Sequence, residues 1–176
     1  MTVWVALLRA INVSGSGRLP MKEFRALLSG MGFEQVETYI QSGNAVFGSG
    51  LAAPALERMI RDGVLASFGF APDVFLVDAE RIAAALMDHP FAGAEPSRVH
   101  VCFLKTTPAP DEAVLEALAV PGDGWHIGPC RFTLHTPAGY GSSKLAQTLP
   151  RLLPAPMTAR NLRSVAALHA LAAARG

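Results

Sequence analysis

The sequence predicts an α+β fold of two ferredoxin-like (split βαβ) subdomains, each an antiparallel sheet with its helices on one face. Two observations support this prediction. Residues 1–78 show strand and helix patterns in the order β-α-β-β-α-β, and a similar cycle begins near residue 98. The chain is 51% hydrophobic and 16% charged, which supplies a substantial core and excludes a disordered chain.

The first subdomain is expected to span residues 1–78. "TVWVALLRAI" reads as a buried strand rather than a signal peptide, because no basic residue precedes it and no small-residue cleavage site follows. "MKEFRALLSGMG" places Phe24, Leu27, Leu28 and Met31 on one helical face before Gly32 ends the helix. The other predicted elements are two strands around a Ser-Gly-Asn turn, a second helix and a fourth strand, at "QVETYI", "NAVFGS", "APALERMIRDGVLASF" and "PDVFLVD".

A linking helix and loop are expected over residues 79–97, and a second ferredoxin-like subdomain with a C-terminal helix over 98–176. The predicted elements are a strand, a helix, a hairpin and a helix, at "RVHVCFLK", "DEAVLEALAV", "GWHIG" with "CRFTLH", and "SKLAQTLPRLL". The final strand of the cycle is predicted to be missing or replaced by a last helix, "ARNLRSVAALHALAAA", with Thr158 as its cap.

Charge is unevenly distributed along the chain. Residues 1–123 contain all 14 acidic residues, whereas residues 124–176 contain none and carry six lysines and arginines. This basic third either binds an anionic partner or packs against the acidic remainder and neutralises it. Cys102 and Cys130 fit no zinc or redox spacing and are expected to be buried, reduced thiols, which favours a cytoplasmic location. No apolar run is long enough for a membrane span, so no membrane association is expected.

One polar cluster is predicted at an edge of the first sheet. In a ferredoxin-like unit the end of strand one, the start of helix one and the turn between strands two and three lie at the same edge. Uncapped helical N–H groups and cations at such an edge suit a phosphate or carboxylate. The alternative is an unoccupied polar edge, since Asn and Gly are common in turns and "GSG" is too short for a phosphate-loop motif. The candidate anion-binding residues are Arg9, Asn12, Lys22, Gln41, Ser42 and Asn44.

A second cluster is predicted in the basic third. Ser142 or Ser143 is expected to cap a helix whose first turn holds Lys144, and a cation there opposes the helix dipole unless an anion binds. The same argument applies to Arg160 in the last helix. The candidate residues of this cluster are Tyr140, Ser143, Lys144, Arg160 and Asn161.

Catalytic and metal motifs are not apparent. The five histidines lack metal-site spacing, so no metal and no cofactor are predicted, and no catalytic residue is assigned. His126 and His135 could face each other across the predicted hairpin, which would allow an acid–base pair. Whether the protein is an enzyme is left open.

Four segments together resemble the bacterial domain-of-unknown-function family DUF1697: "ALLRAINV", "TYIQSGN", "GYGSSKL" and "TARN". The resemblance runs over nearly the whole chain and implies a pair of ferredoxin-like subdomains, but it supplies no activity, cofactor or catalytic residue. Here Ala10 stands where the family pattern has Gly, and Leu162 where it has Trp. The residues that match the family signature are Arg9, Asn12, Tyr39, Gln41, Ser42, Gly43, Asn44, Tyr140, Gly141, Ser143, Lys144, Arg160 and Asn161.

We therefore expect a small protein that binds a phosphorylated small molecule or nucleotide, with both polar clusters lining a common hollow. Nucleic acid is a less favoured partner because only 7% of the chain is aromatic, and the predicted sheet offers chiefly Trp4 and Phe47 for base stacking. The alternatives are an enzyme acting on a phosphorylated or carboxylated metabolite, and a non-catalytic interaction module. The sequence does not indicate an oligomeric state.

Overall fold

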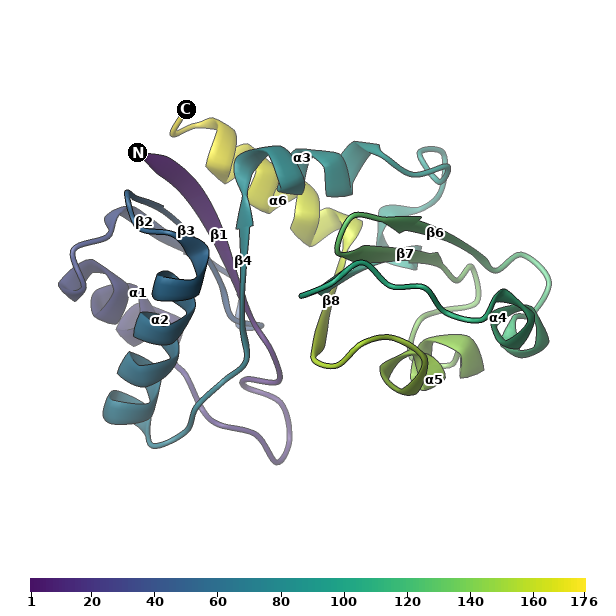
Figure 1. Ribbon diagram of the computed structural model, residues 1–176, viewed down its shortest axis with the longest axis horizontal. Helices are drawn as coiled ribbons and strands as arrows, with labels where there is room; N and C mark the ends of the chain where they lie inside the picture. The colour runs from purple at the N-terminus through teal and green to yellow at the C-terminus, as the bar shows by residue number, and fades with distance from the viewer. The chain divides into compact units, whose positions relative to one another are not determined.

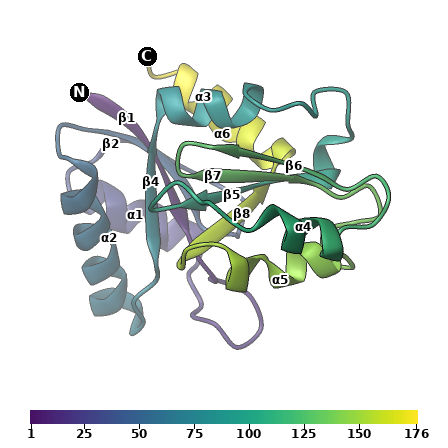
Figure 2. The same ribbon diagram turned by 45° about the vertical axis from the view of Figure 1, so that its right-hand side comes forward.

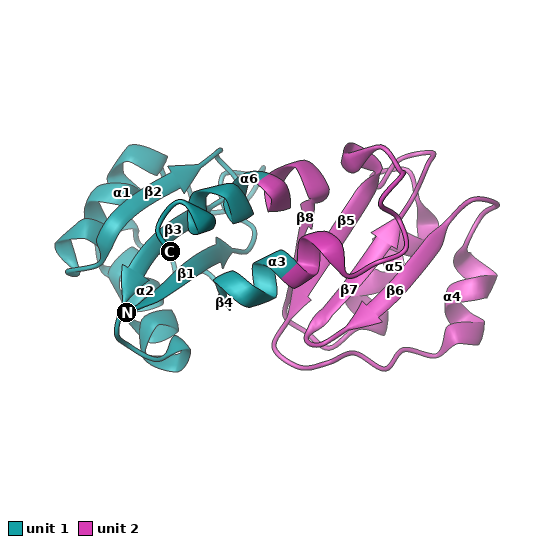
Figure 3. Cartoon of the chain, turned by 90° about the horizontal axis from the view of Figure 1, so that it is seen from above, with its two compact units in different colours: residues 1–83, 167–176 teal, residues 84–166 magenta.

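The computed structural model describes residues 1–176 and divides into two compact units (Figure 3). Unit 1 comprises Met1–Ala83 and Ala167–Gly176, and unit 2 comprises Ala84–Ala166. The divisions fall within helices α3 (Ala79–Met87) and α6 (Leu162–Ala173). Each unit contains a four-stranded antiparallel sheet, so the predicted α+β fold with two ferredoxin-like subdomains is confirmed. No helix is both long and apolar enough to cross a bilayer.

Unit 1 has the strand order β2-β3-β1-β4, with helices α1 and α2 on one face of the sheet (Figure 1). The core lies between this face and the helices, where Phe24 and Leu28 of α1 meet Leu56 and Ile60 of α2. The elements are β1 (Thr2–Leu8), α1 (Met21–Gly30), β2 (Glu34–Tyr39), β3 (Asn44–Ser49), α2 (Ala53–Phe68) and β4 (Val74–Asp78).

Unit 2 repeats this arrangement, with the strand order β6-β7-β5-β8 and helices α4 and α5 on one face (Figure 2). Its core contains Leu115 of α4, Phe132 of β7, and Leu145 and Leu149 of α5. The elements are the 3-10 helix η1 (Pro96–Arg98), β5 (Val99–Leu104), α4 (Glu112–Leu118), β6 (Gly124–Gly128), β7 (Arg131–His135), α5 (Lys144–Leu152) and β8 (Met157–Asn161).

The prediction that the last strand of the second cycle is missing was wrong. Residues Met157–Asn161 form β8, which pairs antiparallel with β5 from Met157 opposite Leu104 to Asn161 opposite His100. Thr158 therefore lies inside a strand, and Asn161 caps α6 by accepting a hydrogen bond from Ser164 N at 3.0 Å. The five-residue strand "MTARN" runs directly into a long Ala-rich helix. Since Asn and Ala are depleted in strands, its local pattern resembles the start of that helix.

Cys130 also departs from its predicted position. It is not a buried strand residue but a half-buried residue of the β6–β7 turn, with φ of 52°. Cys102 is buried in β5, and both cysteines are free thiols. Two-residue hairpin turns contain a residue with positive φ, which glycine and asparagine adopt most easily. A cysteine is uncommon at such a position, so its residue type gave no indication that it lies in the turn.

Candidate functional site

Asn12 brings together the three segments that were predicted to meet at the edge of the unit 1 sheet. Its Nδ2 donates hydrogen bonds to Leu19 O at 2.7 Å and to Gln41 O at 2.9 Å, and its Oδ1 accepts one from Leu19 N at 2.7 Å. Leu19 lies two residues before α1, just ahead of Pro20, and Gln41 lies in the β2–β3 turn. The side chain of Asn12 therefore ties the helix start to the turn.

The β2–β3 turn itself is held by buried interactions. Asn44 is fully buried, and its Nδ2 donates to Tyr39 O and to Ser42 Oγ, both at 2.9 Å. Gly43 has φ of 82°, and its carbonyl accepts a hydrogen bond from Leu8 N at 2.8 Å. The amide side chains of Asn12 and Asn44 are thus engaged with the protein's own backbone, and both shape the edge.

The cations of this edge are placed differently from one another. Arg9 pairs with Asp73 at 3.3 Å, and both side chains are about half exposed. Asp73 was not predicted to lie at this edge because it is 64 residues from Arg9 in the sequence, just before β4, which pairs with β1. Lys22 and Gln41 are exposed. Helix α1 begins after Pro20 without a side-chain cap, so its first N–H groups have no hydroxyl or carboxylate cap; Glu23 is the acid of its first turn.

In unit 2, Ser143 caps α5 as predicted, accepting a hydrogen bond from Ala146 N at 3.1 Å. Lys144 is the first residue of this helix and is exposed. Tyr140 instead turns toward the core, where its ring stacks on His100 with the centroids 4.1 Å apart. It also hydrogen-bonds Cys102, and burial raises the pKa of the tyrosine above its ordinary range and that of the Cys102 thiol to about 12. Both groups are therefore protonated and unreactive at neutral pH.

Arg160 and Asn161 lie on opposite faces of the unit 2 sheet, because successive residues of a strand alternate between faces. Asn161 shares with His100, its partner in β5, the face that α4 and α5 cover, whereas Arg160 lies opposite Val101 on the other face. Arg160 is buried, and its Nη1 donates to Thr158 Oγ1 at 2.7 Å and to Ala159 O at 2.9 Å. Burial lowers its pKa to about 10, so it is still charged at neutral pH.

Three arginines of the basic third pair with acids from the first 123 residues. Arg131 bonds Asp88, Arg163 bonds Glu95 at 2.5 Å, and Arg175 bonds Glu37 at 3.1 Å. The first two pairs lie within unit 2 and the third within unit 1. These pairs support the alternative in which the basic third neutralises acidic parts of the same chain.

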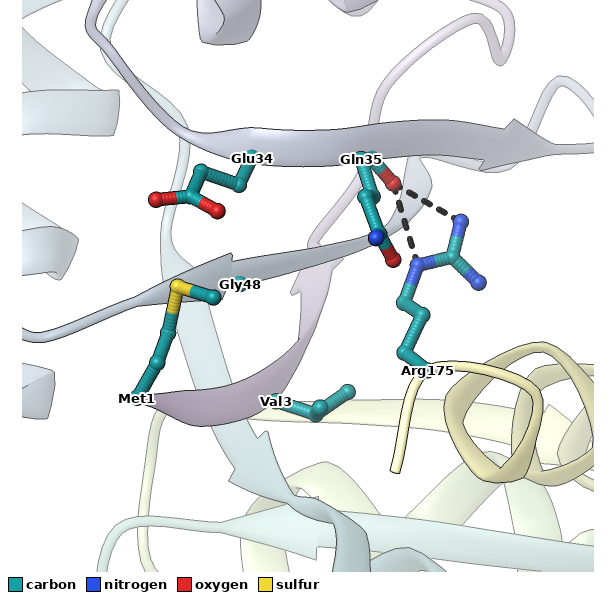
Figure 4. Close-up of a pocket in the computed structure, with 6 residues that line it drawn as sticks. All are labelled: Met1, Val3, Glu34, Gln35, Gly48 and Arg175. Carbon is teal, nitrogen blue, oxygen red and sulfur yellow. Dashed lines mark hydrogen bonds between the residues drawn. The ribbon is translucent and has the colours of Figure 1, made fainter.

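Arg175 also fixes the end of the chain to the outer strand of unit 1 (Figure 4). Its Nε and Nη2 donate to Gln35 O at 3.0 and 2.8 Å. Gln35 has φ of 49° and lies where the β2–β3 register shifts, so the guanidinium binds the carbonyl of an irregular strand segment. A small pocket of about 60 Å³ adjoins this contact, beside Met1, Val3 and Gly48. No sequence motif signals this contact.

His126 and His135 lie on the same face of the unit 2 sheet, the one away from α4 and α5, but their positions are diagonal rather than paired. His126 pairs with Thr133 and His135 with Gly124. Phe91 covers this end of the hairpin: its ring centroid is 5.4 Å from that of His135, and a Cβ at Gly124 would lie 2.9 Å from its ring. No group of three or more His, Cys, Asp or Glu side chains is arranged to hold a metal ion. The imidazoles thus form part of a packed surface under the segment after α3.

Together these features define a tandem ferredoxin-like α+β protein whose polar edges are partly engaged by its own backbone and carboxylates. The chain belongs to the family described as protein of unknown function DUF1697, which matches residues 1–128. A solved structure, described as that of a conserved bacterial protein from Streptococcus pneumoniae, is similar with a TM-score of 0.73 and 23% sequence identity. The similarity covers 97% of this chain and 98% of that one, and it supports the fold. The comparison with curated proteins finds no match.

Proposed function

We propose that this protein binds a phosphorylated small molecule, such as a nucleotide, where α1 begins at the edge of the unit 1 sheet. One observation carries the proposal: α1 starts without a side-chain cap, at a point that Asn12 ties to the β2–β3 turn. Helix α1 therefore presents N–H donors beside exposed Arg18, Lys22 and Gln41. Donors at a helix start, together with nearby cations, favour a phosphate group.

The remaining candidate residues take supporting roles in this proposal. Arg9 lies at the same edge and would add a third cation to Arg18 and Lys22, although its charge is paired with Asp73. Ser42 and Asn44 hold the turn in shape by their mutual hydrogen bond. In unit 2, exposed Lys144 at the start of α5 offers a second anion position, whose shape is set by Tyr140 and the Ser143 cap. Because both cysteines are free thiols, we place this activity in the cytoplasm.

Thermal unfolding in phosphate, sulfate and nucleotides at constant ionic strength tests the proposal. A ligand at 100 times its Kd stabilises the folded state by about 2.7 kcal/mol. Pro20→Asp places a carboxylate cap on the same N–H groups and should abolish the stabilisation. Lys22→Ala should weaken it, whereas Glu23→Gln should strengthen it by removing the acid of the first turn.

Arg25→Ala is the matched control, since Arg25 is an exposed cation in the same helix but beyond its first turn. If Arg25→Ala and Lys22→Ala reduced the anion-dependent stabilisation equally, the effect would be one of general charge and not of a site at the helix start. The absence of any shift across the anions would contradict the proposal and favour the non-catalytic interaction module. Turnover of a phosphorylated metabolite would show that the bound compound is a substrate and favour the enzyme alternative. RNA binding that weakens steeply with salt would favour a nucleic-acid partner instead.

A further inference from the structure

Unit 2 contains a second, chemically different hollow, formed by the end of α3, the segment that follows it and the first turns of α6. It measures about 440 Å³, within the range of pockets that hold small organic ligands. Most of its lining is aliphatic, and no lining residue is acidic. The aliphatic and small lining residues are Leu86, Met87, Ala92, Pro96, Leu162 and Ala166.

His89 forms a neutral wall of this hollow. Its Nδ1 accepts a hydrogen bond from Phe91 N at 3.1 Å, so its Nε2 carries the proton and donates to Leu86 O at 2.9 Å. Burial lowers the pKa of His89, which keeps the ring uncharged at neutral pH. Met87 is 67% exposed, and its flexible thioether side chain can adapt to an apolar ligand.

The positive charge of this lining is on Arg163, in the first turn of α6. Its side chain is 65% exposed, and Nη2 donates to Glu95 Oε1 at 2.5 Å. An ion pair this exposed is weak, and a guanidinium has five N–H donors, so a ligand carboxylate can share or replace Glu95. Helix α6 has no acid in its first turn, which leaves the positive end of its dipole beside Arg163.

We propose that this hollow binds a medium-chain fatty acid, with the alkyl chain against the aliphatic lining and the carboxylate on Arg163. The apolar lining accounts for the chain, and the charge of Arg163 accounts for the carboxylate. This proposal is independent of the phosphate site, which lies in unit 1.

Calorimetric titration of the full chain with decanoate, below its micelle concentration, tests the proposal. Decanoate should bind at least tenfold more tightly than decanol, because only the acid offers a charge-assisted bond to Arg163. Arg163→Gln should remove this difference while leaving the binding of decanol unchanged. Arg151→Gln, which alters an exposed arginine outside the hollow, should bind both ligands as the unaltered protein does.

Ala166→Phe fills the hollow from an exposed position and should abolish binding of both ligands without lowering the thermal midpoint. Pro20→Asp should leave decanoate binding unchanged. Equal affinity for decanoate and decanol would overturn the assignment of the carboxylate to Arg163. Full decanoate binding by folded Ala166→Phe would place the ligand elsewhere and overturn the proposal as a whole.

Discussion

The two units place different residues at equivalent positions of the same topology. Leu8 N bonds Gly43 O in unit 1, and Leu104 N bonds Cys130 O in unit 2, so Gly43 and Cys130 correspond. By the same strand pairing, Trp4 lies opposite Asp78 and His100 lies opposite Asn161. Asp78 then caps α3 and Asn161 caps α6. In both units, therefore, the last strand of the sheet ends in a residue that caps the following helix. The two units share no sequence repeat that would reveal this similarity.

The two sheets differ more strongly on the face that points away from α1 and α2 in unit 1, and away from α4 and α5 in unit 2. In unit 1 this face carries buried Val5, Leu7, Val46, Phe75 and Val77. In unit 2 the corresponding face carries buried Arg131, Thr133, Thr158 and Arg160 among its apolar residues. Strand order thus fixes which positions face each way, whereas side-chain chemistry at those positions is set separately in each unit.

The largest expected effect concerns the equivalent turn positions, Gly43 in unit 1 and Cys130 in unit 2. A Cβ at Gly43 would lie 2.4 Å from Ile11 Cδ1 and 3.0 Å from Leu8 Cβ, and φ there is 82°. Gly43→Ala should therefore destabilise unit 1 by about 3 kcal/mol or more, from backbone strain and steric overlap together. Cys130 also has a positive φ, of 52°, although it carries a side chain. Cys130→Gly removes the backbone strain that a Cβ causes there and should stabilise unit 2 by about 1 kcal/mol.

Urea unfolding can follow each unit separately, because Trp4 lies in unit 1 and Trp125 in unit 2. Trp125→Phe leaves Trp4 as the reporter, and Trp4→Phe leaves Trp125. Gly32→Ala is the matched control, since Gly32 has φ of 85° but open space around its Cβ position. If Gly32→Ala cost as much as Gly43→Ala, overlap with Ile11 and Leu8 would not contribute.

The Asp88–Arg131 pair distinguishes the sheet face away from α4 and α5 in unit 2 from the corresponding apolar face of unit 1. Arg131 is only 6% exposed, so Asp88→Asn leaves a buried guanidinium without its carboxylate and should destabilise unit 2 by about 2 kcal/mol. Combining it with Arg131→Leu should recover part of this loss, because the uncompensated charge is then removed. Glu95→Gln breaks a pair exposed on both sides and should have a much smaller effect on the urea midpoint. Equal losses would indicate that burial of Arg131 does not strengthen its dependence on Asp88.

Acid sensitivity should differ between the units because His100 occupies the position that Trp4 occupies in unit 1. Burial lowers the pKa of His100 from 6.5 to about 4. Between these values the unfolded state binds a proton that the folded state does not, so the stability of unit 2 falls as the pH drops from 6.5 to 4. After allowance for solvent screening, the loss should be about 1.5 kcal/mol.

Urea unfolding of Trp4→Phe at pH 7 and at pH 4.5 measures this loss. His100→Gln should flatten the profile, although His89, whose pKa is also lowered by burial, contributes a remainder of the same sign. Tyr140 and Cys102 do not titrate in this range, because burial raises the pKa of each. An unchanged profile in His100→Gln would assign the acid sensitivity to other groups.

Sequence periodicity predicted the elements of both units because most of their strands and helices bury one continuous apolar face. It failed at β8, where five residues with weak strand preference are held by pairing with β5, a contact that is not local in sequence. This error also affected the predicted site. At the start of a helix, Arg160 and Asn161 would both contribute to one polar cluster, but in a strand they lie on opposite faces of the sheet. The meeting of Asn12 with Gln41 could be anticipated from topology alone. The pairing of Arg9 with Asp73, and of Arg131 with Asp88, depends on side-chain reach across elements and could not.

The smallest expected effect concerns the two equivalent helix caps. Asp78 and Asn161 each accept a hydrogen bond from the third residue of the following helix, at 2.8 and 3.0 Å, but only Asp78 adds a negative charge. A carboxylate at a helix start interacts favourably with the helix dipole by about 0.3–1 kcal/mol. Asn161→Asp should therefore stabilise the protein by this amount, and Asp78→Asn should destabilise it equally, because both substitutions keep the oxygen acceptor. Thermal unfolding at low and high salt separates the two contributions: the charge term weakens with added salt, whereas a difference in hydrogen bonding would persist.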